Sequence, residues 1–335
     1  MSSIKRSFII FAICFFSSLC LGNDKQGEYP ELRVGVLKFG TINWEMAIIK
    51  QQQFDTSRNF KLQVIPFASK NAAAVALQGN AVDVILTDIF WVAKQRSLGK
   101  HYQITPTHKA NGGIVGSPSE TPFQITDLIG ASIGIGGGSS DKSWLVLQLL
   151  ARLKNVSLTD TDIRYATPPL LHRMTIQNKV DFSINFWHYN ARALATKKAI
   201  LLPVSSMLKS IDIEGEVPIM GWVANETFAQ QNKTLFKSFI QASLSAKRHL
   251  LASSANWQTI KHLTKAENDA VFEQLIRLYP DTLLSGFNQQ HKRRIQVLLN
   301  KFKHVELDQH LGNINYLPDD IYWQDAYFTL ESDTQ

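Results

Sequence analysis

Apolar residues recur along the chain in two alternating patterns: short continuous runs, and longer stretches with helical spacing. The run at Leu32–Lys38 is typical of a buried strand, and the spacing of apolar residues between Asn43 and Gln53 predicts a helix. The same order recurs downstream, with strands expected at 61–67 and 81–86 and helices at 72–78 and 89–97. Strands that alternate with helices require a parallel sheet with crossover connections. The pattern therefore predicts an α/β lobe within residues 31–117.

A second series with the same layout follows the first. It predicts strands at 131–135, 162–166 and 180–185, and helices at 142–153, 170–178 and onward to Leu194. A Val-Asp pair opens the last strand of each series, at Val82-Asp83 and at Val180-Asp181. We interpret the two series as a structural repeat, with the second lobe at 123–213. Two such lobes are expected to enclose a cleft at the carboxyl ends of their strands, where open parallel sheets bind ligands.

Turn-rich segments separate these parts of the chain. Ser117–Pro122 is predicted to cross into the second lobe, and Ile213–Pro218 is predicted to return. A strand at 219–224 would then rejoin the first lobe, and helical periodicity continues to about Phe302. We therefore assign residues 218–335 to the first lobe, with the C-terminal end wrapped over it.

Residues 1–22 have the pattern of a secretory signal peptide, because two basic residues precede an apolar run from Phe8 to Leu21. Cys20 and Gly22 fit the small-residue pattern before a cleavage site. Leu19 precedes Cys20 where a lipoprotein needs a small residue, which disfavours a lipid anchor. No later segment approaches the roughly 20 apolar residues that a membrane span requires. We therefore expect an exported protein of the periplasm.

Composition narrows the chemistry. Both cysteines, Cys14 and Cys20, lie in the predicted leader, so the mature chain would lack disulfides, thiolate nucleophiles and cysteine-based metal sites. The formal net charge is +7, but basic residues are scattered among acidic ones. The dense run at His291–Arg294 is typical of a solvated helix face rather than of a nucleic-acid site. We expect no nucleic-acid partner, no cofactor and no metal.

A glycine- and serine-rich turn joins the strand at 131–135 to the next helix. Gly137 and Gly138 allow the backbone to approach a ligand closely, and Ser139 and Ser140 add hydroxyl groups. The free N–H groups and the dipole at the helix start favour an anion there. We predict a cradle for a sulfonate, carboxylate or phosphate; the alternative is a tight turn with a Ser or Asp cap and no ligand.

Other candidates follow the ends of the strands in the first lobe. Thr41 and Trp44 follow the first strand, Ser69 follows the second, and Thr87 and Asp88 end the third. Asp88 either caps the next helix or faces the cleft. In the cleft its carboxylate would favour a cationic or amine-bearing ligand, because a buried carboxylate needs a partner.

Aromatic residues supply the remaining candidates. Asn185 and Trp187 follow the last strand of the second lobe, and Trp222 lies on the return strand. Trp44, Trp187 and Trp222 either stack on a flat or quaternary-amine solute or pack as ordinary core residues. His188 has no second metal ligand at suitable spacing, so we interpret it as a hydrogen-bonded structural histidine.

The glycine turn also nearly matches a dinucleotide-binding fingerprint. In Gly134–Ser139, however, serine replaces the third glycine, and no acidic residue closes a strand at the usual distance. Export would also remove the protein from nucleotide pools. We therefore exclude an oxidoreductase of this type.

The order and spacing of several motifs resemble those of periplasmic substrate-binding proteins of ABC importers, in the nitrate, taurine and alkanesulfonate branch that includes thiamine-precursor binders. The matching motifs are Leu32–Leu37, Leu77–Val84, Ile125–Ile135, Gly138–Asp141, Asn178–Asp181 and Val223–Phe228. The chain departs from the family at Thr87–Trp91 and at Asn185–Tyr189, where its residues are bulkier. Its ligand is therefore not simply inherited from a characterised member.

The resemblance implies a Venus-flytrap (type II) protein without enzymatic activity, whose two mainly parallel sheets are flanked by helices. Such a protein closes on a small-molecule solute and delivers it to an ABC permease in the inner membrane, and we expect a monomer. The solute is either an aliphatic sulfonate or taurine-like anion, or a pyrimidine or other heteroaromatic amine. The alternatives are a periplasmic sensor that signals to a membrane partner, and an enzyme like the pyrimidine synthases of the same fold. Those synthases carry a cysteine-rich motif that the mature chain would lack.

Overall fold

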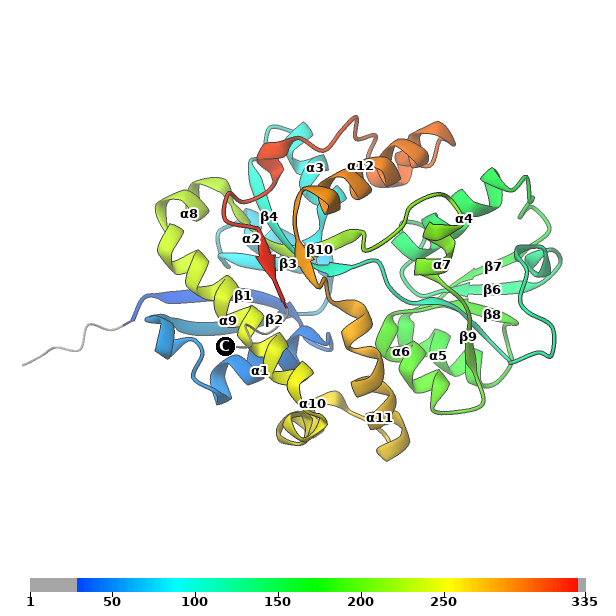
Figure 1. Cartoon of the computed structure of the whole chain (residues 1–335), viewed down its shortest axis with the longest axis horizontal. Coiled ribbons are helices and arrows are strands. Elements are labelled where there is room, and N and C mark those ends of the chain that lie inside the picture. Colours follow the sequence, from blue (N-terminus) through cyan, green and yellow to red (C-terminus); the bar gives the residue numbers. More distant parts are fainter. Residues whose placement is uncertain (1–28, 331–335) are drawn as a thin grey trace, which may run out of the picture.

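The computed structural model describes residues 29–330, so the predicted signal peptide at 1–22 lies outside the described part. Figure 1 shows two lobes side by side, each a sheet with helices packed on it, joined by chain segments that pass between them. The two sheets contain five strands each. The predicted two-lobe α/β fold is confirmed.

Lobe 1 is built on a sheet in the order β2-β1-β3-β10-β4. Its strands are β1 (Glu31–Leu37), β2 (Lys61–Phe67), β3 (Val84–Asp88), β4 (Tyr102–Lys109) and β10 (Pro218–Asn225). The connecting helices are α1 (Ile42–Gln51), α2 (Lys70–Gln78) and α3 (Ile89–Ser97). Helices pack on β1 and β3 and most residues of both strands are buried, which explains their apolar runs.

Lobe 2 has the matching order β7-β6-β8-β5-β9. Its strands are β5 (Gly113–Gly116), β6 (Ser132–Ile135), β7 (Asp162–Tyr165), β8 (Phe182–Ile184) and β9 (Ala199–Pro203). Its helices are α4 (Lys142–Leu153), α5 (Pro168–Ile176), α6 (Trp187–Leu194) and α7 (Val204–Lys209). The bounds of α4 match the prediction, because the side chain of Asp141 caps its first turn.

Each sheet contains one strand that runs against its neighbours. β10 is antiparallel to β3 and β4, and β5 is antiparallel to β8 and β9. Both strands are the first to form after the chain has crossed from the other lobe. The remaining strands end at the edge that faces the opposite lobe, so a chain arriving from there enters the sheet in the reverse direction. Each sheet is therefore mainly parallel, as predicted.

Two crossings connect the lobes. The first occurs at 110–112, ahead of the predicted 117–122, because residues 113–116 already pair with β8 and β9 as strand β5. The second lies between α7 and β10, in the region where the sequence predicts the return. Gly112 and Gly215 have φ angles of 84° and 85°, a conformation that favours glycine. Each crossing therefore contains one glycine in the left-handed region.

The C-terminal helices follow β10 and divide their contacts between the lobes. They are α8 (Glu226–Gln231), α9 (Lys233–Ala252), α10 (Lys261–Thr264), α11 (Asp269–Leu278) and α12 (Gln289–His304). Helix α9 packs on α1 of lobe 1, whereas α11 packs on α6 of lobe 2 (Figure 1). The described end of the chain contacts lobe 1: the N–H of Trp323 donates to the carbonyl of Ile104 in β4 at 3.0 Å. Strands β11 (Gly286–Phe287) and β12 (Phe328–Thr329) pair in a short antiparallel ladder, which holds the end of the described chain next to residues 286–287.

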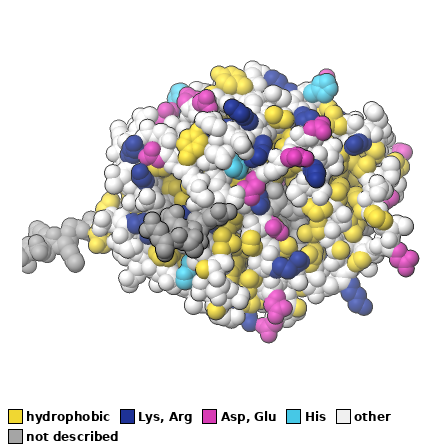
Figure 2. Space-filling model, in the orientation of Figure 1, with side chains coloured by type: hydrophobic (Ala, Val, Ile, Leu, Met, Phe, Trp, Pro, Cys, Tyr) yellow, Lys and Arg dark blue, Asp and Glu magenta, His cyan; other side chains and the backbone are white. Residues whose placement is uncertain are grey.

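Within residues 29–330, no helix combines the length and the apolar character needed to cross a membrane. Figure 2 shows Lys and Arg side chains interspersed with Asp and Glu side chains over the face in view. The run at His291–Arg294 departs from the predicted solvated face: Arg293 is exposed, but His291 is buried and the ammonium of Lys292 lies 4.7 Å from the centre of the Tyr322 ring.

The close approach of β10 to β4 generates a stability prediction. A Cβ atom at Gly221 would lie 2.6 Å from the Cα of Pro106, closer than real Cβ contacts allow, and the neighbouring atoms are backbone. We expect Gly221→Ala to lower the free energy of unfolding by about 1–3 kcal/mol, as measured by denaturant titration. The control is Gly79→Ala, whose Cβ would meet its nearest neighbour at 3.4 Å and whose φ is −90°. Equal stability of the two variants would contradict the packing argument.

Candidate ligand site between the lobes

The carboxyl ends of the strands form a rim on each lobe, and the two rims touch. We call this contact the rim interface. It contains an ion pair between Lys142 Nζ and Asp88 Oδ2 at 3.4 Å. It also contains the ammonium of Lys70, which lies 5.5 Å from the centre of the Phe186 ring. Each of these contacts joins a residue of lobe 1 to a residue of lobe 2.

Asp88 makes two contacts, and the first is the helix cap that the sequence left open as one alternative. Its Oδ1 accepts a hydrogen bond from the N–H of Trp91 at 3.0 Å and so caps α3. Its Oδ2 faces Lys142, the first residue of α4 in the opposite lobe. Lys142 is not among the residues predicted from the sequence, although its place directly after the glycine turn is a signal for the rim. The carboxylate of Asp88 is thus already matched by a cation of this chain.

The glycine turn serves the cap of α4. Asp141 Oδ1 accepts from the N–H of Trp144 at 3.0 Å, and burial raises the pKa of the Asp141 carboxyl. A Cβ at Gly137 would lie 2.8 Å from Asp141 Cγ, and Gly138 has a φ of 74°, so both positions need glycine. Ser139 and Ser140 are exposed. The turn has the expected shape with an aspartate cap, and its use as an anion cradle stays a prediction.

Asn185 connects three parts of lobe 2. Its Nδ2 donates to the carbonyl of Pro168 at 3.0 Å, and its Oδ1 accepts from the N–H of Phe186 at 2.9 Å. A Cβ at Gly136 would lie 2.5 Å from that Oδ1. The amide of Asn185 therefore holds the ends of β6 and β8 and the start of α5 in register behind the rim.

Trp44 and Trp187 meet across the lobes. Their ring centres are 5.7 Å apart with planes at 84°, and Trp257 and Tyr279 complete a ring of edge-to-face and tilted contacts. Trp44 is 3% exposed, and its Nε1 donates to the carbonyl of Leu263 at 3.2 Å. The structure thus brings these two candidates together, with the indole of Trp44 packed against other aromatic rings.

Trp222 requires a correction. The structure places it in the core of lobe 1 rather than in a cleft, because its ring is fully buried on β10. Its Nε1 donates to Ser243 Oγ at 2.8 Å, and its ring packs edge-on against Phe239 at 4.8 Å. Trp222 is therefore an ordinary core residue and does not stack on a ligand.

Three further candidates stand at the start of helices or the end of a strand in lobe 1. Thr41 precedes α1 without a capping hydrogen bond from its side chain. Ser69 is exposed and caps α2 by accepting from the N–H of Ala72 at 3.1 Å. Thr87 is buried on β3, opposite Gly221 of β10. Their roles toward a ligand stay predictions.

A buried charged cluster that the sequence pattern does not predict lies beneath the rim of lobe 1. Glu45 of α1 pairs with Lys247 of α9, and each is at most 1% exposed. The hydroxyl of Tyr279 donates to Glu45 Oε1 at 3.0 Å, and Lys247 Nζ donates to Ser243 Oγ at 2.9 Å. His108 Nε2 lies 3.6 Å from Glu45 Oε1. The cluster therefore fixes α1 against α9, against the end of β4 and against the end of α11.

The ionisation of this cluster follows from its partners. Burial raises the pKa of Glu45, but Lys247 and His108 outweigh it and lower the value to about 2. Burial also lowers the pKa of His108, so its imidazole is neutral. Since a carboxylate faces Nε2, that nitrogen carries the proton and Nδ1 accepts from the hydroxyl of Thr107 at 3.0 Å.

His188 is placed otherwise than the sequence suggests. Its Nδ1 is buried and has no hydrogen-bond partner in the described part of the chain. Burial, with a smaller effect of Arg192, lowers its pKa to about 3. Its ring packs on Tyr189 with centres 4.5 Å apart. Between residues 29 and 330, no group of three or more His, Cys, Asp or Glu side chains is arranged to hold a metal ion.

Two similar α/β lobes that are joined by two crossings and meet at the carboxyl ends of their strands define the two-lobe fold of periplasmic binding proteins. No model of a known protein family matches the sequence, and no curated protein matches it. Solved structures do match.

The periplasmic aliphatic sulphonate binding protein SsuA from Escherichia coli has a TM-score of 0.67 and 18% identity, over 87% of this chain and 96% of that one. The alkanesulfonate-binding SsuA from Xanthomonas axonopodis pv. citri, bound to MOPS, has a TM-score of 0.61 and 18% identity, over 89% and 98%. The ligand-binding component of an ABC-type import system from Staphylococcus aureus has a TM-score of 0.65 and 15% identity, over 89% of this chain and 98% of that one. The resemblance stated from the motifs is confirmed at the level of the fold.

The buried cluster generates a prediction for acid. Because the pKa of Glu45 is about 2 in the folded chain against an ordinary 4.5, its stabilising effect is complete above pH 4.5 and is lost as the pH falls toward 2. The double variant Glu45→Gln with Lys247→Met removes both charges and leaves no unpaired buried charge. We expect its free energy of unfolding to fall by about 3 kcal/mol less than that of the unaltered protein between pH 6 and pH 2. Denaturant titrations between pH 6 and pH 2 measure it.

The matched control is Glu216→Gln, because Glu216 also has a pKa of about 2 but lies outside the cluster. In this variant Glu45 is intact, so the free energy of unfolding should still fall by the amount that Glu45 contributes as the pH is lowered. An unchanged acid dependence in the double variant would show that folding does not lower the pKa of Glu45.

Proposed function

We propose that this chain is an exported solute-binding protein, which captures a small organic solute between the two rims and delivers it to an ABC permease. The observation that carries the proposal is the direct contact of two rims whose lobes are connected by glycine-containing crossings. Opening about the crossings would separate Asp88 from Lys142 and free both charges for a solute. The named functions of the proteins with similar folds support the same role.

The charges at the rim interface bear on the kind of solute. Lys70 and Lys142 supply a cation from each lobe, Asp88 supplies an anion, and Phe186 supplies an aromatic face. A taurine-like solute matches this set, because its sulfonate replaces Asp88 as the partner of Lys142 while its amine takes Asp88. A heteroaromatic amine would use Asp88 and the Phe186 ring. The first class uses more of the charges, and we favour it.

Two substitutions separate these classes. We expect Lys142→Met to weaken the binding of taurine and of ethanesulfonate about tenfold or more, because the sulfonate loses its charged partner. Asp88→Asn should weaken taurine but not ethanesulfonate, which has no amine. Isothermal titration calorimetry of the exported protein measures both, and native mass spectrometry would identify a solute that co-purifies.

The opposite result has a defined meaning. Suppose that a pyrimidine amine binds, and that Asp88→Asn weakens its binding whereas Lys142→Met does not. The solute then belongs to the heteroaromatic class. If neither variant changes the affinity of any solute that binds, the rim interface is not the ligand site.

The glycine turn is tested separately. We expect Ser139→Ala combined with Ser140→Ala to weaken an anionic solute several-fold, because two hydroxyl donors at the start of α4 are removed. The control is Ser157→Ala, an exposed serine beyond the opposite end of α4. Equal affinities of the double serine variant and of Ser157→Ala would assign the turn to capping alone.

A further inference from the structure

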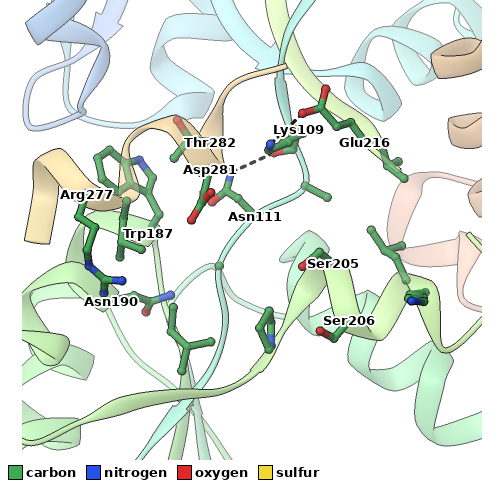
Figure 3. Close-up of a pocket in the computed structure, with 18 of the residues that line it drawn as sticks. Lys109, Asn111, Trp187, Asn190, Ser205, Ser206, Glu216, Arg277, Asp281 and Thr282 are labelled. Atoms are coloured by element: carbon green, nitrogen blue, oxygen red, sulfur yellow. Dashed lines mark hydrogen bonds and ion pairs between the residues drawn. The ribbon is translucent and has the colours of Figure 1, made fainter. Parts of the chain in front are cut away.

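A polar cavity lies beside the crossings. This hinge groove, with a volume of about 1040 Å³, is lined by residues of both lobes and of both crossings. Figure 3 shows Arg277, Asp281 and Thr282 on one wall, Trp187 and Asn190 close to them, and Lys109, Asn111 and Glu216 at the crossings. Of the rim candidates named from the sequence, Trp187 is the one that also lines the groove.

Asn190 points to a missing partner. It is 2% exposed, it lines the groove, and its Nδ2 has no hydrogen-bond partner within residues 29–330. A buried amide N–H without an acceptor is unfavourable by about the strength of a lost hydrogen bond. A Cβ at Gly112 would lie 3.4 Å from this nitrogen, so the small residue at the crossing leaves room beside it. An acceptor supplied by a ligand would satisfy the donor.

Seven charged side chains line the groove: Lys109, Glu216, Arg277 and Asp281, which form two groups, and also Lys198, Lys209 and Glu214. Lys109 and Glu216 pair with each other at 2.8 Å, so they offer little to a ligand. Arg277, at the end of α11, donates through Nε to Gln274 at 2.9 Å and is otherwise exposed. Asp281 follows in the next turn of the chain and is also exposed. In the described part of the chain, neither Arg277 nor Asp281 takes part in an ion pair, so one wall presents a cation and an anion together.

An apolar surface accompanies these charges. Trp187, Leu194 and Leu278 line the same groove, and α6 and α11, which carry them, pack against each other. Ligand sites combine an apolar lining of this kind with a few converging polar groups.

We propose that the hinge groove binds a zwitterionic amino acid with an apolar or aromatic side chain. The carboxylate of the ligand accepts hydrogen bonds from Arg277 and from Nδ2 of Asn190, and its ammonium pairs with Asp281. Its side chain lies along Trp187 and Leu194. The site is separate from the solute proposed for the rim interface, and because both lobes line it, its ligand favours the arrangement of the lobes described here.

Three related probes test the zwitterion requirement. L-Phenylalanine carries both charges, 2-phenylethylamine lacks the carboxylate, and 3-phenylpropionate lacks the ammonium. We expect calorimetry on the full chain to show binding of phenylalanine, with each analogue weaker by about tenfold or more. Equal binding of the three probes, or no binding of phenylalanine, would overturn the proposal.

Variants locate the site. Arg277→Gln and Asp281→Asn should each weaken phenylalanine about tenfold, whereas Arg293→Gln, an exposed arginine of α12, should leave it unchanged. Asn190→Leu has a similar shape and removes the unpaired amide, so it should weaken phenylalanine while the melting temperature of the ligand-free protein does not fall.

The two proposed sites fail independently. Loss of phenylalanine binding in Lys142→Met, with full binding in Arg277→Gln, would move the amino acid to the rim interface and refute the hinge groove. Binding of phenylalanine that depends on Arg277 and Asp281, without any solute at the rims, would support the groove and contradict the proposed transport function.

Discussion

The carboxylate of Glu216 holds the two crossings of this protein together. It accepts from Lys109 at the end of β4 at 2.8 Å and from the hydroxyl of Ser285 at 2.8 Å. Burial opposes its charge, but hydrogen bonds from His291, Lys109 and Ser285 lower its pKa to about 2. Both crossings are therefore anchored on the side of lobe 1. The left-handed glycines, Gly112 and Gly215, come within three residues of the anchored pair.

Trp187 contacts both the rim interface and the hinge groove. It packs on Trp44 at the rims, on Tyr279 at the end of α11, and it lines the hinge groove. Tyr279 in turn donates to Glu45, which pairs with Lys247 in the core of lobe 1. A rotation of lobe 2 therefore changes the rim contacts and the groove together, while the buried pair keeps α1 rigid within lobe 1.

Sequence pattern predicts the parts of this fold that depend on local chemistry. The helix at 142–153 is recognisable from its apolar spacing and the glycine turn before it. Strand β5 is not predicted from the sequence, because its four residues are too few for a clear pattern and include two glycines, although β8 and β9 pair with it. Within the site, strand ends identify Asp88. They do not identify its partner Lys142, because that contact depends on how two separate lobes meet. The burial of Trp222 depends likewise on α9, which supplies Phe239 against its ring and Ser243 as its hydrogen-bond acceptor.

The indole pair at the lobe boundary has a spectroscopic consequence. Trp44 belongs to one lobe and Trp187 to the other, and their rings meet edge to face at 5.7 Å in a mostly dry aromatic cluster. Separation of the lobes would wet both indoles and remove their mutual contact. Intrinsic tryptophan fluorescence should therefore change when the lobes separate, so no attached dye is needed to follow that motion.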